Sequence, residues 1–255
     1  MAGMDPIVGG PRGSPEQPSN WWQSPAGQAL VDWEQQQFDA MLVDVFGFHA
    51  VQLGLARWPT LRANRMSHQL VVERDRASLP GALPTAVLVE DFLSLPFASD
   101  SLDLVVAPHA FEHSADPRQV LREIHRVLRP EGRLVMSGFN PVSLWGAQRL
   151  LGLQAAPDAD GPWISLPRLR DWFVLLGLEC QHTRHGIYRP CLRSEPWLRR
   201  IQFLERAGDR WWPICGAVYV AVAVKRVPAL RMLEPKFKRR RVRAQVATVG
   251  ARREA

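Results

Sequence analysis

Between residues 50 and 137, short apolar runs alternate with turns or with segments of helical periodicity. Residues 117–128 carry apolar side chains at helical spacing, whereas the other runs are short and bounded by turn residues. Their nearly continuous apolar character is typical of parallel strands that helices cover on both faces. The sequence therefore predicts an α/β chain with a mostly parallel sheet. The expected strands are residues 50–55, 68–73, 86–91, 102–107, 133–137 and 217–225.

Capping residues and prolines mark the expected helix boundaries. Ser24-Pro25 is typical of an N-cap followed by proline at the first helical position, so we expect a helix from 25 to 46 that Gly47 ends. Residues 129–132, Arg-Pro-Glu-Gly, are expected to break the helix that begins at Pro117. Two further helices are expected near residues 141–151 and 166–176.

The two ends of the chain differ from its middle. Residues 1–20 contain eight Gly or Pro and almost no large apolar side chains, so they cannot bury enough surface to offset the entropy of ordering. From Lys225 onward, eleven Lys or Arg stand against two Glu, a net charge of +9. Because the whole chain carries +7, the first 224 residues carry −2. We expect a disordered segment at 1–22, one domain at 23–228 and a disordered basic tail at 229–255.

Composition argues against several classes of protein. A hydrophobic content of 46% and a charged content of 22% are ordinary for a globular chain. No apolar run reaches the roughly 20 residues that cross a bilayer, and the N-terminus lacks the pattern of a secretory signal. Cys180, Cys191 and Cys215 form no CxxC pair, which argues against a disulfide framework or a cysteine zinc site. We expect a cytoplasmic protein.

Two features leave the question of partners open. The cluster 236–243 (KFKRRRVR) can bind phosphates or an anionic membrane surface. It contains one aromatic residue, Phe237, so RNA binding by stacking is unsupported, and a basic tail is more often a solvated appendage. The pairs Trp21-Trp22 and Trp211-Trp212 could line an apolar pocket or a partner surface, but core packing is the favoured interpretation. The oligomeric state cannot be read from the sequence.

A longer motif covers residues 91–134. Asp91 is followed by LPF at 95–97 and LDLVV at 102–106. Next come EH at 112–113, DP at 116–117, LREI at 121–124 and VLRPEGRL at 127–134. This order and spacing resembles the class I S-adenosylmethionine-dependent methyltransferases of the type 11 group, which also includes quinone-biosynthesis enzymes. The resemblance, weaker over residues 30–225, implies a doubly wound, seven-stranded Rossmann-like sheet and S-adenosylmethionine as the cofactor.

The resemblance also implies where the cofactor binds. In this family, partners for the ribose hydroxyls and the adenine amino group follow the second and third strands. Glu73 and Asp91 occupy these two positions, although Glu73 is equally explained as part of a solvated charge run. Four apolar residues complete the expected cofactor site, namely Phe92 and Leu93 beside the adenine and Ala107 and Pro108 at the fourth strand.

The loop after the first strand departs from the family pattern. Only Gly54 remains of the glycine-rich loop that lets the backbone approach the cofactor closely. Leu55 and Trp58 stand where the methionine end of the cofactor is expected, and Arg57 could pair with the cofactor carboxylate instead. The favoured interpretation is a methyltransferase that acts on an unidentified small-molecule acceptor. The alternative is a catalytically inactive relative that keeps the fold as a binding or scaffolding module.

His109 and His113 are the candidate catalytic residues. A histidine can act as a base for a hydroxyl or amine acceptor, because its ordinary pKa lies near neutrality, although His113 is also explained by packing before a helix. Residues 109–113, His-Ala-Phe-Glu-His, formally match the HxxEH motif of inverted zinc peptidases. Nearby prolines leave only a short helix there and no third ligand is evident, so we predict no metal site.

Overall fold

The computed structural model describes residues 20–79, 85–152, 161–191 and 203–227. The expected tail at 229–255 and most of the expected N-terminal segment at 1–22 lie outside the described residues. No helix in the described part of the chain is long and apolar enough to cross a membrane.

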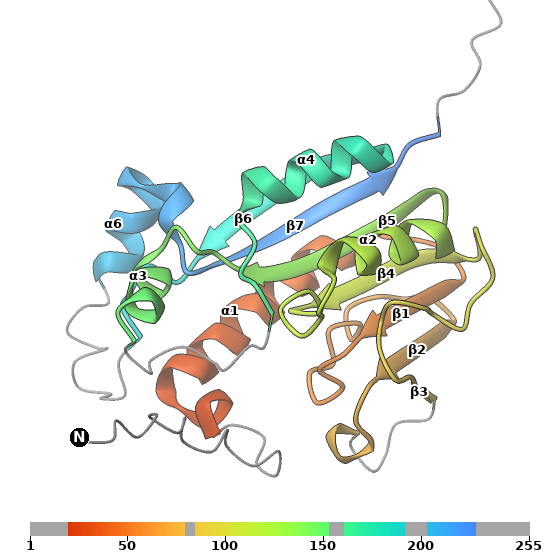
Figure 1. Cartoon of the computed structure of the whole chain (residues 1–255), viewed down its shortest axis with the longest axis horizontal. Helices are drawn as coiled ribbons and strands as arrows, with labels where there is room; N and C mark the ends of the chain where they lie inside the picture. The colour runs from red at the N-terminus through yellow and green to blue at the C-terminus, as the bar shows by residue number, and fades with distance from the viewer. Residues whose placement is uncertain (1–19, 80–84, 153–160, 192–202, 228–255) are drawn as a thin grey trace, which may run out of the picture.

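One seven-stranded sheet forms the centre of the molecule, in the order β3-β2-β1-β4-β5-β7-β6 (Figure 1). The strand order reverses between β1 and β4, and neighbouring strands from β3 to β5 are parallel. β7 runs antiparallel to both of its neighbours, β5 and β6. The expected doubly wound, mostly parallel fold is confirmed. The strands are β1 (His49–Leu53), β2 (His68–Glu73), β3 (Ala86–Leu88), β4 (Leu102–Pro108), β5 (Leu128–Phe139), β6 (Leu178–Gly186) and β7 (Val218–Lys225).

Helices cover both faces of the sheet (Figure 1). α1 (Pro25–Leu42) packs on one face, where its Phe38 and Leu42 join the buried side chains of β4, β5 and β7. α2 (Pro117–Val127) and α4 (Leu166–Leu176) pack on the other face in a second cluster. The other helical segments of the described residues are η1 (Asn20–Gln23), η2 (Arg76–Ser78), α3 (Leu144–Leu150), α6 (Phe203–Trp211) and η3 (Pro213–Cys215).

The start of α1 is as expected, but its end is not. The hydroxyl of Ser24 accepts from the Gly27 amide at 3.1 Å, with Pro25 at the first helical position. The helix ends at Leu42, so the expected end at Gly47 is wrong. A Cβ at Gly47 would lie 2.5 Å from that of Asp103, whose carboxylate accepts from the next two amides at 2.8 and 3.0 Å. Glycine is therefore needed there for close packing at the start of β1.

Several strand boundaries also differ from the expected ones. β1 ends at Leu53 and β3 at Leu88, two and three residues earlier than expected. β5 begins at Leu128, directly after α2, so residues 129–132 belong to a strand instead of a break. The register between β4 and β5 shifts in this region, and Glu131 adopts a φ of +65°. The chain thus changes from helix to strand through an irregularity at the sheet rim.

Two elements and one tryptophan pair were not anticipated. β6 lies at the sheet edge and alternates between exposed and half-buried polar side chains, and α6 follows it on the same side. The prediction that Trp211 and Trp212 pack in the core is wrong, because their side chains are 73% and 45% exposed. Trp21 and Trp22 are half-buried and pack against a cluster that contains Trp145.

Candidate active site

The loop that follows β1 is held by one buried side chain, Gln52. Its amide nitrogen donates to the carbonyls of Gly54, Leu55 and Trp58 at 3.0, 3.0 and 2.9 Å. Its amide oxygen accepts from the Thr60 hydroxyl at 2.7 Å. The loop conformation is therefore fixed from beneath by a residue that the sequence did not single out.

Gly54 occupies a position that requires glycine. Its φ is +74°, and a Cβ there would lie 3.4 Å from the ring of Phe92. The next residue, Leu55, also has a positive φ of +48°. The backbone turns sharply at the carboxyl end of β1 and passes close to the segment that follows β3.

Glu73 ends β2 and faces the same loop. It is buried, and its two carboxylate oxygens accept from the amides of Ala56 and Arg74 at 3.1 and 2.9 Å. Because a carboxylate oxygen has two lone pairs, each can still accept a further hydrogen bond. Glu73 is therefore a structured part of the edge and not one member of a solvated charge run.

Two arginines near this edge contact main-chain carbonyls. Arg74 donates to the carbonyl of Glu90 at 3.4 Å and also to that of His113, so it links the ends of β2, β3 and β4. Arg57 is exposed and donates to the carbonyl of Ala77 at 3.4 Å. The structure thus brings Arg74, which was not among the expected residues, to the centre of the carboxyl edge.

The segment after β3 carries three of the expected cofactor residues. Asp91 is half-buried, and its carboxylate accepts from the Leu93 amide at 2.9 Å. Phe92 is buried in the core and Leu93 packs against it. The Asp91 side chain is accessible while its neighbours anchor the turn.

His109 directly follows β4 and is the centre of a buried charged cluster. Its Nε2 lies 2.9 Å from a carboxylate oxygen of Glu34 on α1, and its Nδ1 lies 3.6 Å from one of Glu112. All three side chains are at most 3% exposed. The second distance is too long for a hydrogen bond, so Glu112 acts on the ring through its charge. Glu112 instead accepts from the Phe139 amide at 2.6 Å.

The two carboxylates decide the protonation of His109. Burial alone would lower the pKa, but the charge of Glu34, its hydrogen bond and the charge of Glu112 raise the pKa of His109 from 6.5 to about 10. The ring is therefore an imidazolium at neutral pH. Its backbone φ of +49° is also unusual for a residue other than glycine.

Aromatic rings enclose this cluster. The His109 ring lies 4.2 Å from that of Phe139, 5.9 Å from Trp22 and 6.4 Å from Trp58, between ring centroids. Trp22 and Trp58 contact each other edge to face at 4.6 Å. The first-strand loop and η1 thus meet above the end of β4.

The cluster contains buried polar atoms that no described residue satisfies. They include the second carboxylate oxygens of Glu34 and Glu112 and the hydroxyl of Ser137, whose carbonyl accepts from the His109 amide. Ala107 and Pro108 lie in β4 beside them, paired with Met136 and Ser137 of β5. Buried polar groups normally have partners, so this end of β4 has unused capacity to bind a polar ligand.

Glu34 was missed because it lies 75 residues before His109. One signal could have found it. Leu30, Glu34, Phe38 and Leu42 follow one another at intervals of four, and all are buried. A carboxylate within such an apolar stripe must have a partner.

Comparison with known proteins places the chain in a family. A family model described as a methyltransferase domain matches residues 55–136. The uncharacterized protein YafS of Escherichia coli is 30% identical over 239 residues, which cover 93% of this chain and 92% of YafS. The chain belongs to the class I S-adenosylmethionine-dependent methyltransferases of the type 11 group. Its cofactor is S-adenosylmethionine.

Other similarities are more limited. The malonyl-[acyl-carrier protein] O-methyltransferase 1 of Coxiella burnetii is 41% identical over 63 residues, which cover 25% of this chain and 22% of that enzyme. A possible histamine N-methyltransferase from Thermotoga maritima has a TM-score of 0.60 at 16% identity, over 81% of this chain and 93% of that one. A chain from the complex of the Haloferax volcanii Trm112 methyltransferase activator and the putative methyltransferase has a TM-score of 0.58 at 18% identity. The match covers 84% of this chain and 100% of that chain. These two structures support the fold alone.

The residues at the carboxyl edge of this methyltransferase fit the adenosine part of the cofactor. At Gly54 any side chain would be strained by the positive φ and would approach Phe92. Glu73, at the end of β2, and Asp91, in the segment after β3, offer carboxylate lone pairs. Backbone approach and acceptors for hydroxyl and amino groups are what adenosine recognition needs.

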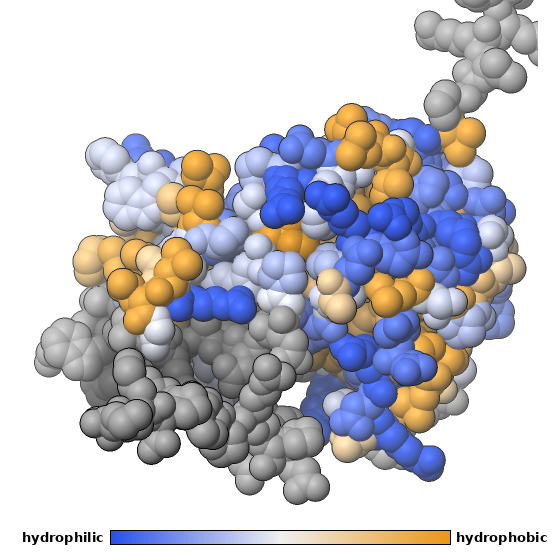
Figure 2. Space-filling model, viewed as in Figure 1, coloured by the Kyte–Doolittle hydropathy of each residue, from blue (hydrophilic) through white to orange (hydrophobic). Residues whose placement is uncertain are grey.

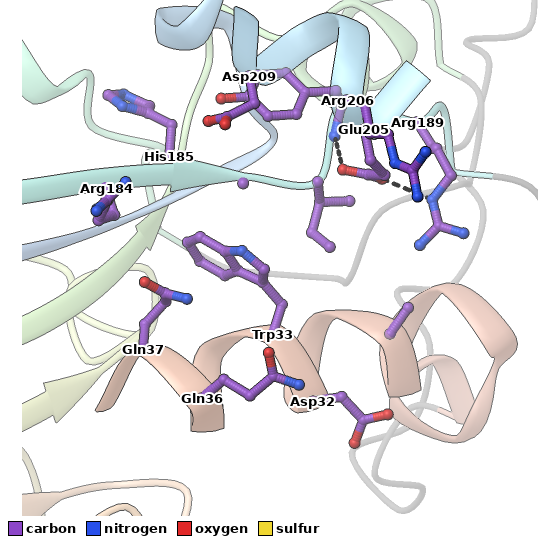
Figure 3. Close-up of a pocket in the computed structure, with 14 residues that line it drawn as sticks. Asp32, Trp33, Gln36, Gln37, Arg184, His185, Arg189, Glu205, Arg206 and Asp209 are labelled. Carbon is purple, nitrogen blue, oxygen red and sulfur yellow. Dashed lines mark hydrogen bonds and ion pairs between the residues drawn. The ribbon is translucent and has the colours of Figure 1, made fainter. Parts of the chain in front are cut away.

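A separate pocket of about 730 Å³ lies between α1, β6 and α6 (Figure 3). Trp33, the neighbour of Glu34 on α1, points across it toward β6. Its lining contains equal numbers of acidic and arginine side chains, three of each. None of the expected site residues lines this pocket. The pocket is thus distinct from the cluster at His109.

Proposed function

We propose that this chain is an active enzyme that transfers a methyl group from S-adenosylmethionine to a small-molecule acceptor at the end of β4. The observation that carries the proposal is the buried cluster of Glu34, His109 and Glu112. Burying charged groups is costly, and a residue with unfavourable φ persists only where its surroundings enforce it. Both features occur together at functional sites, and here they lie beside the residues that suit adenosine.

Each residue then has a proposed role. Gly54, Glu73, Asp91, Phe92 and Leu93 hold the adenosine part, and Ala107 and Pro108 form the adjoining wall. Arg57 is the proposed partner of the cofactor carboxylate, a role that would require it to leave the Ala77 carbonyl.

The chain's own contribution to the reaction is positioning and exclusion of water. When bound, S-adenosylmethionine supplies the methyl group and a good leaving group. Trp22, Trp58 and Phe139 exclude water from the end of β4, and fixed neighbours reduce the entropy cost of bringing two reactants together. His109 is protonated and positioned by Glu34, so it orients groups and does not accept a proton. His113 is left as the candidate base.

Isothermal titration with S-adenosylmethionine and S-adenosylhomocysteine tests the cofactor site. We expect both to bind, and we expect Asp91→Ala to weaken binding by about 1.5–3 kcal/mol, the value of a hydrogen bond to a charged group. Asp44→Ala, which changes an exposed carboxylate after α1, is the matched control and should bind normally. If neither compound binds the unmodified chain, the enzymatic function is rejected.

Turnover separates the enzyme from its alternative. The position of Leu55 and Trp58 in the first-strand loop favours an inactive binding module, because the usual glycines are replaced there. Release of S-adenosylhomocysteine in the presence of a small-metabolite extract, measured against an extract-free control, would support the enzyme. Tight cofactor binding without release across fractionated extracts would support the module.

A further inference from the structure

Large apolar side chains are exposed together on α3, α6 and η3. They are 50–88% exposed, and Leu150 is the most exposed of them. Figure 2 shows apolar surface gathered over α3 and α6, at the left of the molecule. Monomeric proteins rarely expose contiguous apolar surface of this kind without a partner. We call this set the α3–α6 patch, and it comprises Leu144, Leu150, Leu151, Phe203, Trp211 and Ile214.

The two halves of the patch are fixed side by side. The side-chain amide of Asn140 donates to the carbonyls of Val142, Ile214 and Gly216 at 3.2, 2.8 and 2.9 Å. It therefore ties the residues before α3 to η3. The Ser143 hydroxyl also caps α3 by accepting from the Gly146 amide at 3.1 Å. Figure 1 shows α3 and α6 together at one end of the sheet.

α6 is held firmly enough to present its apolar residues outward. The Glu205 carboxylate accepts from the Arg189 guanidinium at 2.6 Å and from the Tyr188 amide at 3.1 Å, as the dashed lines in Figure 3 show. The Tyr188 hydroxyl donates to the Pro213 carbonyl at 3.0 Å, and Gly208 lies against the Tyr188 ring. The exposure of Trp211 is therefore built into the packing of α6.

Among the residues that the structure describes, the charges around the patch are predominantly positive. α3, α6 and the adjoining Arg189 carry four arginines and two acids, and Glu205 is already paired with Arg189. Trp, Phe, Leu and Ile rimmed by arginine is the composition of a surface that enters the headgroup region of a bilayer. The other arginines at the rim are Arg149, which lies over the Trp163 ring, Arg206 and Arg210.

The sequence contains a second positively charged region that would be attracted to an anionic surface. The segment 236–243 contains six Lys or Arg and no acid. Basic residues near an anionic bilayer contribute electrostatic attraction, and shallow apolar insertion contributes the rest. Membrane binding by peripheral proteins increases with the buried apolar area and with the electrostatic attraction to anionic lipids, so the two contributions add.

We propose that the α3–α6 patch docks this protein on an anionic membrane surface, with the basic tail as the second contact. The orientation of the protein on the membrane follows from two neighbouring residues of α3. Trp145 is buried and contacts Trp21, whereas Leu144 is exposed in the patch. Docking therefore brings the bilayer to the end of the sheet where η1 and the His109 cluster lie. An acceptor of low water solubility could then reach that end directly from the lipid. The membrane contact itself does not depend on the proposed methyl transfer.

Cosedimentation of the full chain with phosphatidylcholine vesicles, with and without phosphatidylglycerol, tests the proposal. We expect binding to vesicles that contain phosphatidylglycerol, and weaker binding at high salt because the charges are screened. The triple variant Leu150→Ser/Leu151→Ser/Trp211→Ser should reduce the partition coefficient at least tenfold, since it removes most of the inserted apolar surface.

The matched control is Val174→Ser/Leu175→Ser on α4, which changes side chains that are equally exposed, at 77% and 81%, but outside the patch. This control should bind like the unmodified chain. Should the triple variant fail to fold, quenching of the unmodified chain by brominated phosphatidylglycerol replaces it. In that measurement Trp211→Phe/Trp212→Phe should remove the quenched component.

Three outcomes overturn the proposal. They are no binding to phosphatidylglycerol vesicles, equal binding by the triple variant, and a dimer in sedimentation velocity that the triple variant dissociates. The last would assign the patch to a second copy of the chain. Because the readout is lipid binding, failure here leaves the cofactor titration unaffected.

Discussion

The ends of β3 and β4 lie at the same edge of the sheet but use charged side chains in opposite ways. After β3, Asp91 keeps a half-exposed carboxylate whose conformation rests on one amide hydrogen bond. After β4, His109 is wholly buried between two carboxylates and adopts a strained backbone conformation. The Asp91 carboxylate therefore has lone pairs that can bind a ligand, whereas the charges around His109 are buried and interact with one another. Loss of the first should therefore affect binding, and loss of the second should affect stability.

The largest expected effect is at His109. His109→Asn keeps a residue that tolerates a positive φ but removes the cation between Glu34 and Glu112. Leaving buried charge uncompensated typically costs about 3–5 kcal/mol of unfolding free energy. Urea denaturation at pH 8 measures this loss.

A second variant identifies the cause of that loss. Adding Glu34→Gln to His109→Asn removes one of the uncompensated charges, so it should recover part of the lost stability. If the double variant is less stable than His109→Asn alone, the charge of Glu34 is not what destabilises the single variant.

The next expected effect is that the unfolding free energy depends on pH through His109, at the end of β4. The folded pKa of His109 is about 10, above its value of 6.5 in the unfolded chain. Its contribution to stability is therefore complete below pH 6.5 and is lost as pH rises through 10, at about 1.4 kcal/mol per pH unit in between. The groups facing the ring are Glu34 and Glu112, and burial raises the pKa of the nearby Tyr219 well above its usual value.

Urea midpoints from pH 6 to 10 measure that dependence. His109→Asn should show a shallower decline than the unmodified chain, because other groups titrate equally in both. Parallel curves would mean that His109 is not an imidazolium in the folded protein.

The comparison also shows what the sequence could and could not predict. α4 and β2 were predicted to the residue, and β4 and α2 to within one residue, because apolar periodicity reports burial on one face. β6 was missed because an edge strand of His, Arg and Gln carries no apolar run. Asp91 was placed by a local motif, whereas the pairing of Glu34 with His109 joins elements 75 residues apart. Local patterns specify elements, but the partner of a buried charge is fixed only by packing.

A smaller effect is expected beneath the first-strand loop. Gln52→Leu retains the bulk of the side chain but leaves three loop carbonyls without their donor. Because the loop can rearrange toward solvent, we expect a loss of about 1–3 kcal/mol, the cost of unsatisfied buried acceptors. Hydrogen exchange should rise in residues 54–60 more than in β5, which serves as the internal reference.

The smallest effect on stability is expected at Asp91, which sharpens the contrast with His109. Asp91→Ala removes a side chain that is half-exposed and that accepts one hydrogen bond from its own turn. Surface substitutions of this kind change unfolding free energy by about 0.5 kcal/mol or less. The same variant should lose cofactor affinity, so binding and stability separate at this residue. A large drop in the urea midpoint of Asp91→Ala would show that the β3 end is part of the folding core, and the distinction between the two strand ends would then be lost.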